Sequence, residues 1–114
     1  HFDYAYRSAH EVDRSLKILD FEDILKKIFK RLIELDKSLE LNVKEQKLIN
    51  DDEHVLNFLK LYKSLGGKNL TISSDAHLVR KLGRKCDKYI ALAKEAGFKE
   101  LCCYIKRKKY IVEI

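Results

Sequence analysis

Apolar and polar positions follow two different periods along the chain, which predicts helices and strands in alternation. Apolar residues recur at helical spacing in three segments: 21–37, from Asp51 or Asp52 to Gly66-Gly67, and from Leu82 to Gly97. Short apolar runs predict strands at 39–43, 69–73 and 101–105, with 110–114 as a hairpin partner after the charged turn 106–109. Strands that alternate with helices favour an α/β fold with a parallel sheet.

The apolar positions of each predicted helix define the face that should pack inward. These are Phe21, Ile24, Leu25, Ile28, Leu32 and Leu35, then Val55, Phe58, Leu59, Tyr62 and Leu65, then Leu82, Cys86, Tyr89, Ile90 and Ala93. Asp20, with Asp23 three residues later, resembles a capping box and should start the first helix. Glycines should end the other two helices.

The length and the hydrophobic content of the chain are those of a single folded domain or part of one. The 114 residues are 46% hydrophobic, enough for a core, which excludes wholesale disorder. No apolar run reaches the roughly eighteen residues of a membrane span, and no signal peptide is apparent. The odd count of three cysteines favours a reducing cytoplasm. Because the chain begins at His1 and contains no Met, we expect 1–114 to be a single fragment of a longer protein.

Positive charge is concentrated in the last third of the chain. Residues 78–109 hold eleven Lys and Arg against three acids, a net charge of +8, within a total of +6. Such a segment could attract nucleic acid or a phosphorylated substrate. A solvated lysine-rich surface is the favoured interpretation, since no aromatic residues interleave with the basic helix as on a stacking platform.

The candidate chemistry begins at Asp75-Ala76-His77, directly after the predicted strand 69–73. Residues two apart in an extended segment point the same way, so carboxylate and imidazole should project together from the strand's C-terminal end. Both groups are good ligands for zinc, iron or manganese. An aspartate that caps the next helix, with a histidine nearby by chance, would give the same pattern.

Other residues could support such a site. His1 and Asp3 repeat the histidine–aspartate pair, and Arg7 could bind an anion bidentately or be a surface arginine. Glu40, an acid inside a strand, could support a metal ligand or face outward on an edge. His10 and His54 are predicted to be surface residues. Phosphate loops and C-x-x-C pairs are absent, and Cys102 and Cys103 should point to opposite faces of one strand.

Several segments together resemble the polymerase-and-histidinol-phosphatase (PHP) superfamily, and its histidinol-phosphatase branch in particular. S-S-D-A-H at 73–77 is similar to the family's GSDAH segment, and H-F-D-Y-A-Y-R at 1–7 to its GHLDxxxR stretch. L-E-L-N at 39–42 is similar to its LEIN strand, and 59–67, 82–87 and 94–98 to the flanking helices. The resemblance covers nearly the whole chain in the right order.

The resemblance implies a metal-dependent phosphatase that hydrolyses L-histidinol phosphate in histidine biosynthesis. It implies a distorted (βα)7 barrel, similar to a TIM barrel, with up to three zinc, iron or manganese ions at the C-terminal ends of its strands. By residue match, His1, Asp75 and His77 would be metal ligands, Arg7 would hold the substrate phosphate, and Asp3 would support the site beside His1.

The chain also departs from the family. The N-terminal half, with its H-x-H pair and bridging glutamate, is absent from the sequence, so we expect the chain alone to be inactive. That missing half of the barrel is then its expected partner, and the open strand edges should drive self-association. The family's T-S-G-x-R is replaced by Val43-Lys44-Glu45-Gln46-Lys47, which keeps open another small phosphate ester as the substrate. A basic nucleic-acid-binding module is the alternative of another class.

Overall fold

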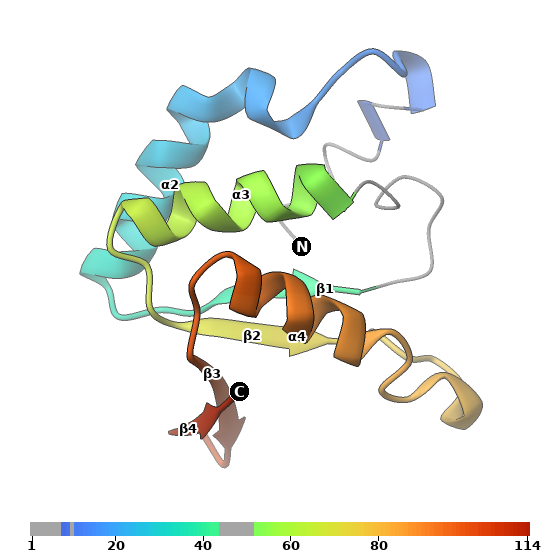
Figure 1. The fold of residues 1–114 in the computed structure, drawn as a ribbon, viewed down its shortest axis with the longest axis vertical. Coiled ribbons are helices and arrows are strands. Elements are labelled where there is room, and N and C mark those ends of the chain that lie inside the picture. The colour runs from blue at the N-terminus through green and yellow to red at the C-terminus, as the bar shows by residue number, and fades with distance from the viewer. Residues whose placement is uncertain (1–7, 10, 44–51) are drawn as a thin grey trace.

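A computed structural model describes residues 8–9, 11–43 and 52–114, and its elements follow the predicted order (Figure 1). They are η1 (Ile18–Phe21), α2 (Glu22–Glu34), β1 (Leu39–Asn42), α3 (Asp52–Ser64), β2 (Leu70–Ser73), η2 (Val79–Lys81), α4 (Cys86–Glu95), β3 (Glu100–Ile105) and β4 (Lys108–Glu113). The predicted alternation of helices and strands is confirmed.

The four described strands form two pairs. β1 and β2 are parallel, with Leu39 opposite Leu70 and Asn42 opposite Ser73. β3 and β4 form the predicted antiparallel hairpin, and β3 contacts β2 without a ladder of hydrogen bonds between them. The parallel α/β arrangement is therefore confirmed, while the described strands do not close into a barrel.

The β1–β2 pair has one apolar and one polar face. Register partners in parallel strands point to the same side, and successive residues alternate. The apolar face consists of Leu39, Leu41, Leu70 and Ile72, and the polar face of Glu40, Asn42, Thr71 and Ser73. The apolar face belongs to the core cluster that α2, α3 and α4 also line. The polar face therefore carries the side chains of this strand pair that could bind a ligand.

Aromatic side chains form the centre of the core. Phe29 of α2 meets Phe58 and Tyr62 of α3 edge-on, with 5.1 Å between ring centroids in both pairs. Tyr62 also donates a hydrogen bond from its hydroxyl to the Asn69 carbonyl oxygen, at 3.1 Å, just before β2 begins. Its ring stacks against Phe98, after α4. These contacts fix the three helices against β2 and therefore position the segment that follows β2.

The first helix differs from its prediction in capping and in inner face. The side chain of Asp20 accepts a hydrogen bond from the Lys17 backbone N–H, at 2.7 Å, and so caps the start of η1. The residue that precedes α2 is Phe21 and not Asp20. The buried positions are Leu25 and Phe29. Four predicted inward residues are 42–56% exposed: Phe21, Ile24, Ile28 and Leu35. The apolar face of α2 is therefore only partly covered by the other described residues.

The basic helix starts later than its periodicity suggests. Gly83 and Lys85 have φ values of 71° and 62°, so the chain turns twice before α4 begins at Cys86. Leu82 lies before these turns and is 78% exposed, which contradicts its predicted inward position. No helix among the described residues is both long and apolar enough to span a membrane.

Candidate metal centre

The segment after β2 is shaped by local hydrogen bonds and by one unusual backbone angle. Asp75 has φ of +46°, a left-handed conformation that aspartate adopts more readily than most residues. Its backbone N–H donates to the Ser73 hydroxyl oxygen at 3.3 Å. The turn before α4 is tied to the same loop, because the Gly83 N–H donates to the Ser74 hydroxyl oxygen at 3.3 Å. The loop thus holds Asp75 at the C-terminal end of β2.

Asp75 and His77 lie side by side, as predicted, although the loop that joins them is not the extended segment from which this was expected. His77 Nδ1 is 3.9 Å from Asp75 Oδ1. The two side chains differ in exposure: that of Asp75 is 22% exposed, with its Oδ2 atom buried, whereas that of His77 is 71% exposed. The structure therefore pairs a sheltered carboxylate with an accessible imidazole, the two donor types that divalent metal ions bind.

The hydrogen bonding of His77 decides which ring nitrogen could bind a metal. Nδ1 lies 2.8 Å from the carbonyl oxygen of Asp75, an atom that can only accept, so we assign the proton to Nδ1. In the neutral ring the lone pair is then on Nε2. A backbone carbonyl that fixes the tautomer in this way is a common support for metal-binding histidines.

The polar face of the β1–β2 pair leads up to this site. Asn42, opposite Ser73 at the end of β1, is only 6% exposed. Glu40 lies two residues earlier on the same face, opposite Thr71, and is half-buried. A strand advances about 3.3 Å per residue, which places Glu40 roughly 7 Å below Asn42. By strand register Asn42 is thus nearer than Glu40 to the segment that holds Asp75 and His77, although the sequence singled out only Glu40; a polar side chain ending an apolar strand was the available signal.

Three predicted site residues lie outside the described part of the chain: His1, Asp3 and Arg7. His10 lies outside it as well. The described residues contain no group of three or more His, Cys, Asp or Glu that could hold a metal ion. Within them, Asp75 and His77 form a pair of candidate ligands.

His54, expected on the surface, is half-buried and structural. Its Nε2 accepts a hydrogen bond from the backbone N–H of Ile18 at 3.3 Å, which links the start of α3 to η1. It therefore connects α3 to η1.

The cysteines carry no sign of metal binding. Cys102 is buried and Cys103 exposed, as expected for neighbours on one strand. Burial raises the pKa of the Cys86 thiol, and this disfavours the thiolate form that binds metals.

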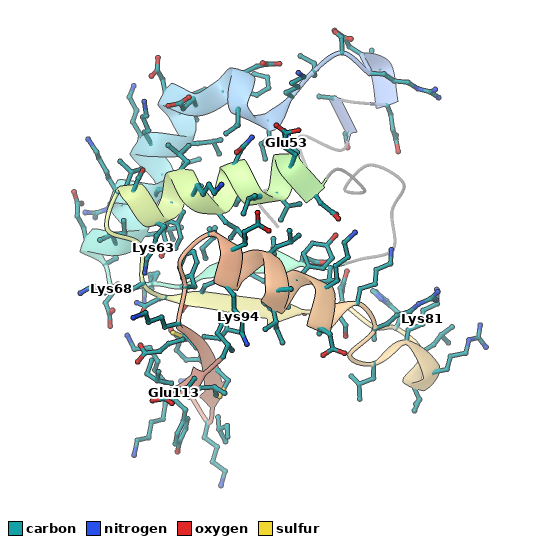
Figure 2. The ribbon with its side chains drawn as sticks, in the orientation of Figure 1. Glu53, Lys63, Lys68, Lys81, Lys94 and Glu113 are labelled. Carbon is teal, nitrogen blue, oxygen red and sulfur yellow. The ribbon has the colours of Figure 1, made fainter. Side chains whose placement is uncertain are left out.

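A cavity of about 400 Å³ lies near the opposite end of β2 and is distinct from the metal centre. Its lining residues are Lys63, Lys68, Gly97, Phe98, Lys99 and Glu100. Figure 2 shows Lys63 and Lys68 close to the turn that precedes β2, and Lys81 on the loop that follows it. The predicted chemistry therefore does not coincide with this cavity.

Comparison with known proteins shows that the chain is similar to histidinol-phosphatases. It is 31% identical over 118 residues to the histidinol-phosphatase of Lactococcus lactis subsp. lactis (strain IL1403), a match covering 99% of this chain and 44% of that protein. It is 24% identical over 110 residues to a probable histidinol-phosphatase of Clostridium acetobutylicum, covering 96% of this chain and 43% of that protein. No protein-family model matches the sequence.

A solved structure agrees with these relatives. The crystal structure of histidinol phosphate phosphatase from Lactococcus lactis subsp. lactis Il1403, complexed with zinc, L-histidinol and phosphate, matches with a TM-score of 0.70 and 30% identity. The match covers 83% of this chain and 36% of the other. Along nearly all of its length this chain is similar to these two histidinol-phosphatases, and it spans less than half the length of the relatives it matches.

Proposed function

We propose that this chain is the C-terminal portion of a metal-dependent phosphatase that hydrolyses L-histidinol phosphate to L-histidinol and phosphate. The observation that carries the proposal is the Asp75–His77 pair at the end of β2, with its sheltered carboxylate and its exposed Nε2. The similar Lactococcus enzyme is complexed with zinc, L-histidinol and phosphate, which supports both the ion and the substrate class.

The donor set fits a divalent ion such as zinc, iron or manganese, of which the complete domain would hold up to three. Asp75 would offer a carboxylate oxygen and His77 its Nε2, and His1 would be a further ligand. A bound ion supplies positive charge that polarises the phosphoryl group and stabilises charge as the ester bond breaks. Asp3 and Glu40 would hold ligands in place rather than touch the substrate.

The remaining residues of this chain would bind and orient the ester. Arg7 would hold the phosphate, since its planar guanidinium matches two phosphate oxygens. Arg80 and Lys81 on η2 follow His77 closely and add positive charge near the same loop. Polar residues on the sheet, with Asn42 beside Ser73, would line the wall of the site.

The architecture implied is a distorted (βα)7 barrel of which this chain provides one part. The two-faced β1–β2 pair supports this, because a barrel strand packs helices on its outer face and presents the other face to the interior. The missing N-terminal half would supply the other strands and ligands. Free cysteines support a reducing, cytoplasmic location.

The sequence of residues 43–47 favours a second candidate substrate for the same phosphatase reaction. Val43 is followed by Lys44-Glu45-Gln46-Lys47 where the family has T-S-G-x-R, so a lysine stands at best near the place of an arginine. Lysine is a point charge rather than a planar fork. Another small phosphate monoester or diester would therefore be the alternative substrate, and a panel of phosphate esters assayed on the longer protein decides between them.

The experiment that tests the proposal uses the longer protein that contains this chain. Phosphate release from L-histidinol phosphate and zinc content are measured for wild type, His77→Ala and Asp75→Asn. We expect activity to fall at least about 100-fold in both variants, with a loss of bound zinc, because each removes a ligand.

His54→Gln is the matched control. It removes an imidazole that bonds to η1 and is not among the predicted ligands, while the glutamine carbonyl oxygen can still accept the hydrogen bond from Ile18. This variant should keep its zinc and its turnover. Normal turnover by His77→Ala would refute the proposal, and so would a steep salt-dependent affinity for DNA or RNA in a protein that lacks phosphatase activity.

A further inference from the structure

The outer edge of the C-terminal hairpin carries backbone groups that the described strands leave unpaired. The Ile114 N–H donates to the Lys99 carbonyl oxygen at 3.0 Å, which marks these two residues as a hydrogen-bonded pair. In an antiparallel ladder such pairs alternate with non-bonded pairs. The residues of β4 that direct their N–H and C=O groups away from β3 are therefore Lys109, Ile111 and Glu113.

The hairpin also exposes an unusual amount of apolar surface. Five of its residues are 41–58% exposed: Tyr104, Ile105, Tyr110, Ile111 and Val112. Sheet edges are usually protected by short strands, by proline or by charged side chains, and β4 carries such charges only at its ends, where Lys108 and Lys109 begin it and Glu113 ends it. The sequence of β4 contains no proline and places three large apolar residues in succession at its centre, so it is suited to pairing with another strand.

The charges at the two ends of β4 indicate which strand could pair with its outer edge. Lys109 lies near its start and Glu113 at its end, both with outward-directed backbone. Lys109 is held by Asp36, whose carboxylate oxygens are 2.8 and 2.9 Å from its ammonium group, so the strand's positive end is fixed in place. An antiparallel strand with the opposite charge order would complement this edge. A second copy of β4 has that order.

We propose that two copies of this chain associate through β4, antiparallel, with Ile111 on the twofold axis. In this register Ile111 faces the partner's Ile111 and Lys109 faces the partner's Glu113. Tyr110 then lies opposite the partner's Val112 and shields it from water. The result is a four-stranded sheet in the order β3-β4-β4-β3.

The register is specific because the alternatives lose these pairings. A shift that centres the axis on Lys109 brings two lysines together, and one that centres it on Glu113 brings two carboxylates together. Like charges directly opposite each other are destabilising. A six-residue strand gives an interface at the low end of the usual range, below about 1,200 Å², so the dimer should depend on concentration. This proposal is independent of the phosphatase activity.

Sedimentation equilibrium of the chain tests the proposal. Between about 10 µM and 1 mM, where weak protein pairs assemble, the average mass should rise from 13.4 kDa towards twice that value. Ile111→Pro removes an outward N–H while leaving the ladder with β3 intact, and proline is accepted at such edge positions. The variant should stay at the monomer mass, whereas Ile111→Val should associate like the wild type.

A charge reversal covers the case in which the proline variant does not fold. Glu113→Lys leaves the contact between Lys109 and Asp36 intact and should be monomeric, because each Lys109 would then face a lysine of the partner. A wild-type mass that stays at 13.4 kDa throughout would overturn the proposal. So would association that persists in folded Ile111→Pro or in Glu113→Lys.

Discussion

Single residues decide whether the turn before β2 can form. A Cβ atom at Gly67 would lie 2.6 Å from the Tyr62 ring and from its carbonyl oxygen. Tyr62 is fully buried and hydrogen-bonded to Asn69, so it cannot move aside. Gly67→Ala should therefore destabilise the chain by about 1–3 kcal/mol, the usual cost of overpacking. Urea unfolding followed by circular dichroism measures this change.

Gly66 provides the comparison. It has φ of +94°, but the space around its missing Cβ is open, so the restriction there is on the backbone and not on volume. Asparagine tolerates left-handed backbone better than other residues. Gly66→Asn should therefore unfold at a urea concentration much closer to that of the wild type. Equal losses in the two variants would mean that contact with Tyr62 is not the reason for glycine at 67.

At the site, sequence reasoning predicted individual residues well where spacing was sufficient. Asp75 and His77 do lie close together, as predicted, but the left-handed backbone at Asp75 departs from the extended chain on which that prediction rests. It could not predict the left-handed angle at Asp75 or the carbonyl that orients His77, since both depend on how the loop is tied to Gly83. Asn42 was missed because its place beside Ser73 depends on strand register.

Among the elements, a polar cluster links the hairpin to the first parallel strands. Lys109 of β4 binds Asp36, which also accepts a hydrogen bond from the Asn69 side chain at 2.7 Å. The hydrogen bond from Lys109 lowers the pKa of the Asp36 carboxyl below its ordinary value of 3.8, with a smaller contribution from Asn69. The same contact raises the pKa of Lys109.

The lowered pKa of Asp36 makes the stability of the folded chain depend on pH. Asp36 binds its proton more weakly in the folded chain than in the unfolded chain, so its contribution is present above pH 3.8 and is lost as pH falls through the lower folded value. We expect the urea midpoint to fall between about pH 5 and pH 2. Asp36→Asn tolerates the same positive φ and should flatten this fall. An unchanged slope in that variant would show that other carboxylates account for it.

Element order was predictable and element boundaries were less so. The alternation of periods identified each described helix and strand of the core, because burial of one face imposes those periods. The exposed apolar residues of α2 show the limit of this method. Periodicity identifies the apolar face of a helix, but it does not show whether another part of the chain packs against that face. The hairpin turn at Lys106 and Arg107 has two positive φ values without glycine or asparagine, so sequence indicated a turn but not its two-residue length.

At the scale of the molecule, the fold provides one wall of a site. The polar face of β1–β2 ends at the Asp75–His77 pair, while the described residues hold no third ligand close to it. A divalent ion needs about four ligands, and two leave it weakly held and exposed to water. The described residues therefore provide a packed core and two candidate ligands, and a metal centre at this position would need further residues.

The need for further residues leads to a test of the isolated chain. Expressed alone and supplied with zinc, it should fold with the helical content of α2, α3 and α4 but release no phosphate from L-histidinol phosphate. Adding the complementary N-terminal segment of the longer protein should restore turnover, because it supplies the remaining strands and ligands around β1 and β2. Circular dichroism and a phosphate assay on the same samples separate misfolding from an incomplete site. Turnover by the folded chain alone would mean that residues 1–114 already contain a sufficient metal centre, and the two-part arrangement would then be wrong.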